Sequence, residues 1–331
     1  MKKYLPIFGK LVVAGIFTLA CWLLYQKLRM YSLSEIMDNI ALVSTGQLAL
    51  SVFLVVINYA ILVGYDWLAV RAVHRRLPLS RISLVSFTGC AVSYNIGALL
   101  GGTAIRYRLY GAWGFKILDI VKLVLMLAVT FWIGALGLAG GVLLFADIHV
   151  PAELGISAGH IKPVGGALLL ICIGYLAVCG LAHGRPIKLF GKECSLPTLG
   201  IALSQTAVAC ADLVVAALCL YVLLPEGADL PFYDFLSNYL LAQVAVVLTH
   251  VPGGVGVLEV ILLHIVHGVT PQRLFGAILI FRVLYYLIPL AISAVLLFFY
   301  ELRLRRRTPE QIELEALSTY LPTHADAPRL H

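Results

Sequence analysis

Residues 93–114 read SYNIGALLGGTAIRYRLYGAWG and lie between two long apolar runs. Within this stretch the pair Gly101 and Gly102 is soon followed by Arg106 and Arg108. Charged side chains are costly at membrane depth, and irregular backbone is tolerated there only where it is buried in protein or lines a cavity. The stretch therefore predicts a broken helix packed inside a bundle, provided that its neighbours span a membrane.

The composition of the chain supports that condition. Of its 331 residues, 61% are hydrophobic and only 12% are charged, whereas a soluble domain carries about 25% charged residues. Several apolar runs reach the roughly 20 residues that a helix needs to cross a bilayer. We therefore expect an all-α polytopic membrane protein. The formal charge of +7 then reflects basic cytoplasmic loops rather than a nucleic-acid partner.

The distribution of basic residues decides how the apolar runs cross the membrane. The sequence contains nine such runs, and clusters of Lys and Arg place the N-terminus, the connections at 71–81 and 184–195, and the C-terminus on the cytoplasmic side. Nine crossings cannot satisfy these assignments. About eight transmembrane helices can, if the run 82–103 enters and leaves from the cytoplasmic side as a re-entrant segment. Residues 1–307 would form one transmembrane domain, and 308–331 a short, partly disordered cytoplasmic tail.

A second broken segment occurs in the other half of the chain, where residues 249–259 read THVPGGVGVLE. Pro252 removes a backbone donor and kinks a helix, and three glycines add freedom at this break: Gly253, Gly254 and Gly256. Paired broken segments in the two halves of a membrane protein indicate a transport site. They are compatible with an inverted repeat. The alternative for each glycine pair is close packing of helices through small residues.

Four ionisable residues within the apolar runs are candidate functional groups: Asp66, Asp212, Glu259 and Arg282. Glu259 and Arg282 are expected at similar depth, so they could form an ion pair that is either structural or functional. Tyr286 follows Arg282 by four residues, which places both on one face of a regular helix. For Asp66 the alternative is an ordinary interfacial charge at the end of its span.

Arg106, Arg108 and Tyr110 follow the first break directly. Guanidinium groups bind phosphate through two parallel hydrogen bonds, so these residues predict a site for a phosphate-bearing headgroup. The alternative is an ordinary positively charged cytoplasmic loop. His264 and His267 have helical spacing, but without a clear third ligand they give only a weak indication of a metal site, and no metal is expected.

Three segments, NIGALLGGTAIRYRLYG, HVPGGVGVLE and FRVLYYLIPL, resemble the membrane domain of the lysylphosphatidylglycerol synthase/flippase family. They resemble its stand-alone relatives, the bacterial inner-membrane proteins of the UPF0104 type, more closely still. The resemblance implies a multi-pass protein of the bacterial inner membrane with a role in lipid translocation. It marks as site residues Arg106, the turn at 252–256, Glu259, Arg282 and Tyr286. Nothing in the chain resembles the soluble aminoacyl-transferase domain of the two-part family members, so no synthase activity is implied.

Together these features predict a flippase or translocase that moves or binds a phospholipid or lipid-linked substrate in a cavity formed by the broken helices. One alternative is an accessory subunit that presents lipid to a lipid-synthesis enzyme. Another is an ion or small-solute transporter or channel, in which a homo-oligomer would complete a ring of backbone carbonyls. The chain contains no phosphate-binding loop and no nucleophile elbow. We therefore expect no enzymatic activity and no cofactor.

Overall fold

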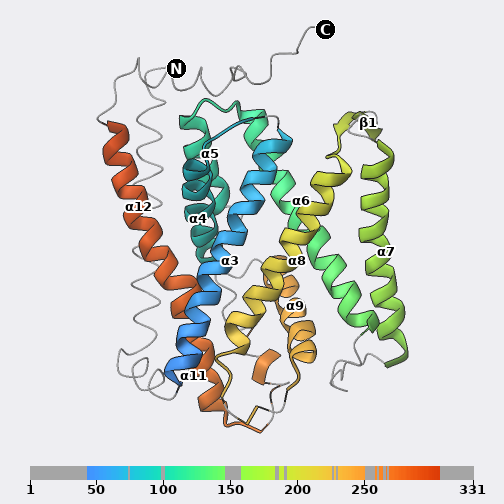
Figure 1. Cartoon of the computed structure of the whole chain (residues 1–331), viewed down its shortest axis with the longest axis vertical. Helices are drawn as coiled ribbons and strands as arrows, with labels where there is room; N and C mark the ends of the chain where they lie inside the picture. The colour runs from blue at the N-terminus through green and yellow to red at the C-terminus, as the bar shows by residue number, and fades with distance from the viewer. Residues whose placement is uncertain are drawn as a thin grey trace.

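The protein is a bundle of long helices (Figure 1). The computed structural model describes residues 43–73, 75–97, 101–145, 158–182, 186–189, 192–225, 227–228, 230–249, 258, 261–263, 266 and 268–305. Within these ranges five helices are long and apolar enough to cross a membrane. The predicted all-α polytopic architecture is confirmed. Two of the nine apolar runs, at 10–26 and 254–268, lie wholly or mainly outside the described residues, as do the tail after 307 and the turn at 252–256.

The described helices and strands follow one another along the chain. Their bounds are α3 (Thr45–Ala72), α4 (Leu79–Ile96), α5 (Thr103–Ala112), α6 (Ile117–Phe145), α7 (Ala158–Ala182), β1 (Pro186–Leu189), β2 (Lys192–Ser195), α8 (Leu199–Tyr221), α9 (Phe232–Thr249), α11 (Pro271–Arg282), the π-helical turn η4 (Val283–Leu287) and α12 (Ile288–Arg305). Strands β1 and β2 form a small antiparallel hairpin between α7 and α8. It is the exception to an otherwise helical fold in the described part of the chain.

Helix α3 is the central element of the bundle (Figure 1). It begins with a capping box in which the Ser44 side chain accepts from the backbone of Gln47, and the Gln47 side chain accepts from the backbone of Ser44. These contacts satisfy backbone donors that the first turn of a helix leaves unpaired. On one side α3 packs along α8, and on the other it meets α4. It therefore borders both of the polar clusters described below.

Helices α4 and α5 form a re-entrant hairpin. Helix α4 ends at Ile96 and is capped by Gly97, whose φ of 106° favours glycine, and α5 returns antiparallel beside it. Arg75, before α4, pairs with Asp119, at the start of α6, at 2.7 Å. Both ends of the hairpin therefore lie at the same end of the bundle, the upper end in Figure 1. The predicted re-entrant arrangement is confirmed, and its entry from the cytoplasmic side stays a prediction.

The predicted boundary of the re-entrant segment at residue 103 is wrong. The returning arm continues to Ala112, so Arg106 and Arg108 lie on a helix inside the bundle rather than in a loop. The arms approach closely because both contain glycine. A Cβ atom at Gly102 would lie 2.9 Å from the carbonyl oxygen of Gly89 and would also collide with the Ser93 side chain.

The last long helix is interrupted by the π-helical turn η4. Pro289 has no N–H with which to bond the carbonyl of Tyr285, four residues earlier. That carbonyl instead accepts from the Tyr59 hydroxyl of α3 at 3.1 Å. The next carbonyl, of Tyr286, accepts from the Asn95 side chain of α4 at 3.1 Å. The π turn thus offers backbone acceptors to two neighbouring helices, as π-bulges at functional positions often do.

Candidate functional site

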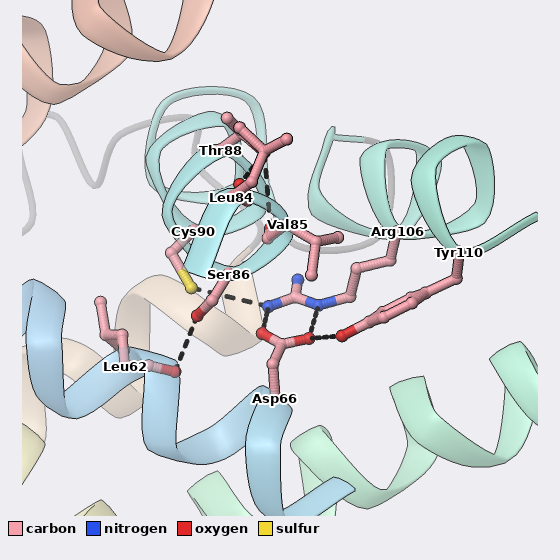
Figure 2. Close-up of polar contacts among 9 residues, drawn as sticks. All are labelled: Leu62, Asp66, Leu84, Val85, Ser86, Thr88, Cys90, Arg106 and Tyr110. Carbon is pink, nitrogen blue, oxygen red and sulfur yellow. Dashed lines mark hydrogen bonds and ion pairs between the residues drawn. The ribbon is translucent and has the colours of Figure 1, made fainter. Parts of the chain in front are cut away.

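A buried ion pair joins α3 to the returning arm of the hairpin (Figure 2). The Arg106 guanidinium donates to both carboxylate oxygens of Asp66, from Nε to Oδ1 at 3.0 Å and from Nη2 to Oδ2 at 2.7 Å. The Tyr110 hydroxyl donates to the same Oδ1 at 2.9 Å. Asp66 is 0% and Arg106 7% exposed. Bidentate pairs of this kind are both strong and geometrically specific.

The surroundings of this pair are shaped to accommodate the guanidinium. A Cβ atom at either Gly89 or Gly102 would lie only 3.1 Å from Nη1 of Arg106. Nη2 also lies 3.6 Å from the Cys90 sulfur. The two glycines therefore serve more than close helix packing, because they leave the space that the Arg106 side chain occupies between the arms.

A second buried polar cluster surrounds Asp212 of α8. The Asn58 amide donates to Oδ1 and to the backbone carbonyl of Asp212, both at 2.9 Å. The Tyr65 hydroxyl donates to Oδ2 at 3.0 Å, and the Tyr285 hydroxyl donates to the Asn58 oxygen. Asn58 is 0% and Asp212 5% exposed. This cluster joins α3, α8 and η4 through side chains at the centre of the bundle.

Tyrosine rings fill the space between the hairpin tip and η4. The Tyr94 ring lies 5.4 Å from that of Tyr285 and 6.0 Å from that of Tyr286, while Tyr59 lies 5.9 Å from Tyr285. Arg282 lies over the Tyr286 ring at 6.0 Å, within the range of a cation–π contact. The hairpin tip, the π turn and α3 therefore meet in one aromatic layer next to the Asp212 cluster.

The structure brings together only some of the predicted site residues. Asp66, Arg106 and Tyr110 share one cluster, and Arg282 contacts Tyr286. Arg108 does not converge with Arg106, because it donates to both oxygens of Glu301 on α12 at 3.1 Å. Gly101 and Gly102 lie where the returning arm begins. Glu259, Pro252 and the glycines Gly253, Gly254 and Gly256 lie outside the described residues, so the predicted pairing of Glu259 with Arg282 stays a prediction.

Sequence reasoning missed Asn58 and Tyr65 and gave Asp66 no buried partner. The sequence does contain an indication of this cluster, because Asn58 and Tyr65 are seven residues apart and so lie on one face of a helix within an apolar run. Arg282 and Tyr286 lie on the same side of their helix, as their spacing predicted. The sequence did not predict the π turn, which begins directly after Arg282 and contains Tyr286.

Comparison with known proteins places the chain among bacterial membrane proteins. No family model matches it. It is 34% identical to the uncharacterized protein slr0712 of Synechocystis over 315 residues, which cover 94% of this chain and 97% of that protein. It is 30% identical to the inner membrane protein YbhN of Escherichia coli over 247 residues, which cover 74% of this chain and 77% of YbhN. The chain belongs to the family of these two proteins. As a member of the YbhN family with several long apolar helices, it is a multi-pass inner membrane protein.

Proposed function

We propose that this member of the YbhN family translocates or binds a phospholipid or a lipid-linked substrate. The proposal is supported above all by the buried pair of Asp66 and Arg106, because it lies on a re-entrant hairpin within the bundle. Ionisable residues at membrane depth typically mark the path of a substrate or an ion, and interrupted helices form transporter sites. The resemblance of three segments to the lysylphosphatidylglycerol flippase domain suggests that the substrate is a lipid.

In this proposal Arg106 exchanges one anionic partner for another. A headgroup phosphate, like a carboxylate, presents two oxygens that can accept the two parallel hydrogen bonds of a guanidinium group. It can therefore replace Asp66 as the partner of Arg106. Tyr110 continues to donate to Asp66 during the exchange, which limits the cost of separating the pair. The acyl chains stay in the surrounding lipid, and the polar groups need to accommodate only the headgroup.

The orientation of the protein in the membrane is also part of the proposal. The end of the bundle at which the hairpin enters contains several basic residues, among them Arg71, Arg75, Arg81 and Lys116. The positive-inside rule favours this end in the cytoplasm. Arg71 and Arg81 lie 3.9 Å and 5.5 Å from the ring centres of Trp67 and Trp113, and aromatic side chains of this kind favour the membrane interface. The same rule, applied to Lys2 and Lys3 and to the arginines at 303–307, favours both termini in the cytoplasm.

Reconstitution tests the proposal. The purified protein in liposomes should exchange headgroup-labelled phospholipids between leaflets, measured with a membrane-impermeant quencher. Arg106→Lys keeps the charge but loses the bidentate fork. We expect it to slow exchange by about tenfold or more, since a charged hydrogen bond contributes about 1.5–3 kcal/mol. Gly111→Ala is the matched control, because an added Cβ there meets no atom within 4 Å.

The same experiment separates the alternatives. If the wild-type protein exchanges no anionic, zwitterionic or lysylated lipid, the translocase proposal is overturned. Ionic conductance without lipid exchange would instead identify a channel. Lipid that copurifies tightly but is not exchanged would indicate an accessory subunit that presents lipid to an enzyme.

A further inference from the structure

The two buried carboxylates of the bundle differ in how their charge is neutralised. Asp66 has a guanidinium at 2.7 Å. Asp212 accepts hydrogen bonds from an amide and a phenol, and no cationic side chain of the described residues forms an ion pair with it. Both carboxylates are at least 95% buried. Asp66 therefore belongs to a neutral pair, whereas an ionised Asp212 would be a buried charge that no cation of the described residues pairs with.

A net charge in that position requires a counterion. Removing a carboxylate from water without an opposite charge is expensive, and such groups are neutralised by a proton, a metal ion or a charged ligand. Buried carboxylates within membrane bundles accordingly serve as proton relays and ion sites. The hydrogen-bond partners of Asp212 decide among these alternatives.

The partners of Asp212 favour a proton over a metal ion. The Asn58 amide presents its N–H group, because its oxygen accepts from Tyr285. Alkali and alkaline-earth ions need a shell of several oxygen ligands, whereas the contacts described here are donors. The Tyr65 hydroxyl can reverse its role, since a phenol both donates and accepts. A proton on Oδ2 of Asp212 can therefore be accepted by the Tyr65 oxygen without displacement of either side chain.

The other titratable groups facing Asp212 are neutral phenols and thiols. They are Tyr59 and Tyr65 of α3, Cys90 and Tyr94 of α4, Tyr239 of α9, Tyr285 of η4, and Cys219 of α8 itself. Helix α11 also packs on α8, and its cation Arg282 lies over the Tyr286 ring. Phenols and thiols stay protonated well above the range in which a carboxyl group titrates. Among these described groups, Asp212 is therefore the one that exchanges a proton most readily.

A second buried polar group marks a route towards Asp212. Gln205 lies two turns before Asp212 on the same face of α8 and is 2% exposed. Its Nε2 donates to Thr130 of α6 at 2.8 Å, but its Oε1 has no donor among the described residues. A buried amide oxygen without a protein donor is a binding position for water. Water there would place a second proton-carrying group about 10 Å from Asp212, on the side of the bundle towards the start of α8.

We propose that Asp212 is a proton-binding site that couples lipid movement to a proton gradient. This inference rests on the proposed translocase function and names its energy source. The coupling runs through α3, where Tyr65 contacts Asp212 and the next residue, Asp66, holds Arg106. Protonation of Asp212 reverses the hydrogen bond to Tyr65, and the change reaches the Asp66–Arg106 pair through the adjacent residue of α3.

Infrared difference spectroscopy tests the proton site without reference to lipid transport. The full chain in lipid nanodiscs, stepped from alkaline to acidic pH, should gain a carbonyl band of a protonated carboxyl group in a dry environment. Asp212→Asn should abolish this band, and Asp212→Glu should shift it. The control Asp119→Asn should keep it, because Asp119 is a partly exposed carboxylate paired with Arg75. A band that persists in Asp212→Asn overturns the assignment.

Transport measurements test the coupling. In proteoliposomes, a pH gradient should change the wild-type rate of phospholipid exchange several-fold, a sodium gradient at constant pH should not, and Asp212→Asn should lose the response. Asp212→Glu, which keeps a titratable group, should retain part of it. Wild-type exchange that ignores the pH gradient, or that follows sodium, overturns the coupling. If the infrared band titrates but no lipid is exchanged, the proposed translocase function fails while the proton site stands.

Discussion

Single side chains of this protein carry charge that the bundle neutralises by direct pairing. Arg106 and Asp66 are 40 residues apart in sequence but form a two-point contact in the core. Each of them depends on the other, because removing one partner leaves the second as an uncompensated buried charge. Removing one of the two charges should therefore destabilise the hairpin more than removing both.

A double-mutant cycle tests this dependence. Arg106→Met should destabilise the protein by about 3–5 kcal/mol, because it leaves the Asp66 carboxylate unpaired. Adding Asp66→Leu should restore much of the loss, since an apolar pair can replace a buried ion pair. Thermal unfolding in one detergent supplies the comparison. Arg108→Ala, which removes a partly exposed pair with Glu301, should cost about 1 kcal/mol or less. Additive losses from the two core substitutions would contradict the idea.

At the residue scale, the sequence identified Asp66, Arg106 and Asp212 but not their contacts. A charged residue within an apolar run can be recognised in the sequence, because it interrupts the run. Its partner cannot be recognised in the same way, because a basic residue on any neighbouring helix could pair with it. Asp66 could equally have paired with Arg71 or Arg75, which are closer in sequence. Only the packing of α5 against α3 selects Arg106.

At the scale of the elements, the two arms of the re-entrant hairpin can pack closely because glycines occupy the positions where they cross. Gly89 and Gly102 face each other, and the space between them contains part of the Arg106 guanidinium. Hydropathy does not predict the returning arm, because TAIRYRLYGA has the composition of a polar loop. The arm is helical within the bundle because Asp66 and Glu301 neutralise both of its arginines.

Glycine substitutions test the crossing of the two arms. Gly102→Ala should destabilise the protein by about 1–3 kcal/mol, because the new methyl group overlaps the Ser93 side chain and the Gly89 carbonyl. Gly111→Ala on the same helix meets open space and should cause no loss, since alanine is the better helix former by about 1 kcal/mol. Melting temperatures of the two variants in the same detergent provide the measurement. Equal stability of both would contradict the crossing.

The π turn η4 gives a further prediction about an element. Tyr59→Phe removes the donor to the Tyr285 carbonyl, which Pro289 leaves without its helical partner. We expect the free energy of unfolding to fall by about 1–3 kcal/mol, which is the cost of leaving a buried acceptor unsatisfied. Tyr107→Phe removes an exposed hydroxyl and serves as the control. The loss should shrink in a Pro289→Ala background, in which the helix regains an N–H. An unchanged melting temperature for Tyr59→Phe would refute this account of the turn.

The whole molecule is polarised along its long axis. The end at which the hairpin enters contains Arg71, Arg75 and Arg81, whereas the opposite end, where α3 begins at Thr45, has few basic residues among those described. The lengths of the apolar runs predicted α3, α6, α7 and α8, and the distribution of basic residues predicted the re-entrant segment. These features are predictable because they follow from the thickness and polarity of the membrane, which constrain every spanning segment in the same way. Contacts between helices depend on particular partners.

Cysteine labelling tests the orientation of this axis. In a background without native cysteines, Gly46→Cys should react with a membrane-impermeant maleimide in intact cells whose outer membrane has been opened. Lys116→Cys should react only after the inner membrane is permeabilised. Both positions are exposed, and the positive-inside rule favours the basic end in the cytoplasm. The reverse labelling pattern would show that the orientation is wrong.

The two arginines of α5 also set an order of assembly during synthesis. The partner of Arg106 lies 40 residues earlier and is already in place when α5 emerges, but the partner of Arg108 lies 193 residues later. At about 5–20 residues per second, Glu301 follows Arg108 from the ribosome by about 10–40 s. Until then the returning arm carries one uncompensated cation, which favours its contact with water or the insertion machinery. The hairpin can therefore close fully only once α12 has been synthesised, so the Arg108–Glu301 contact makes the final packing of an early segment depend on a much later one.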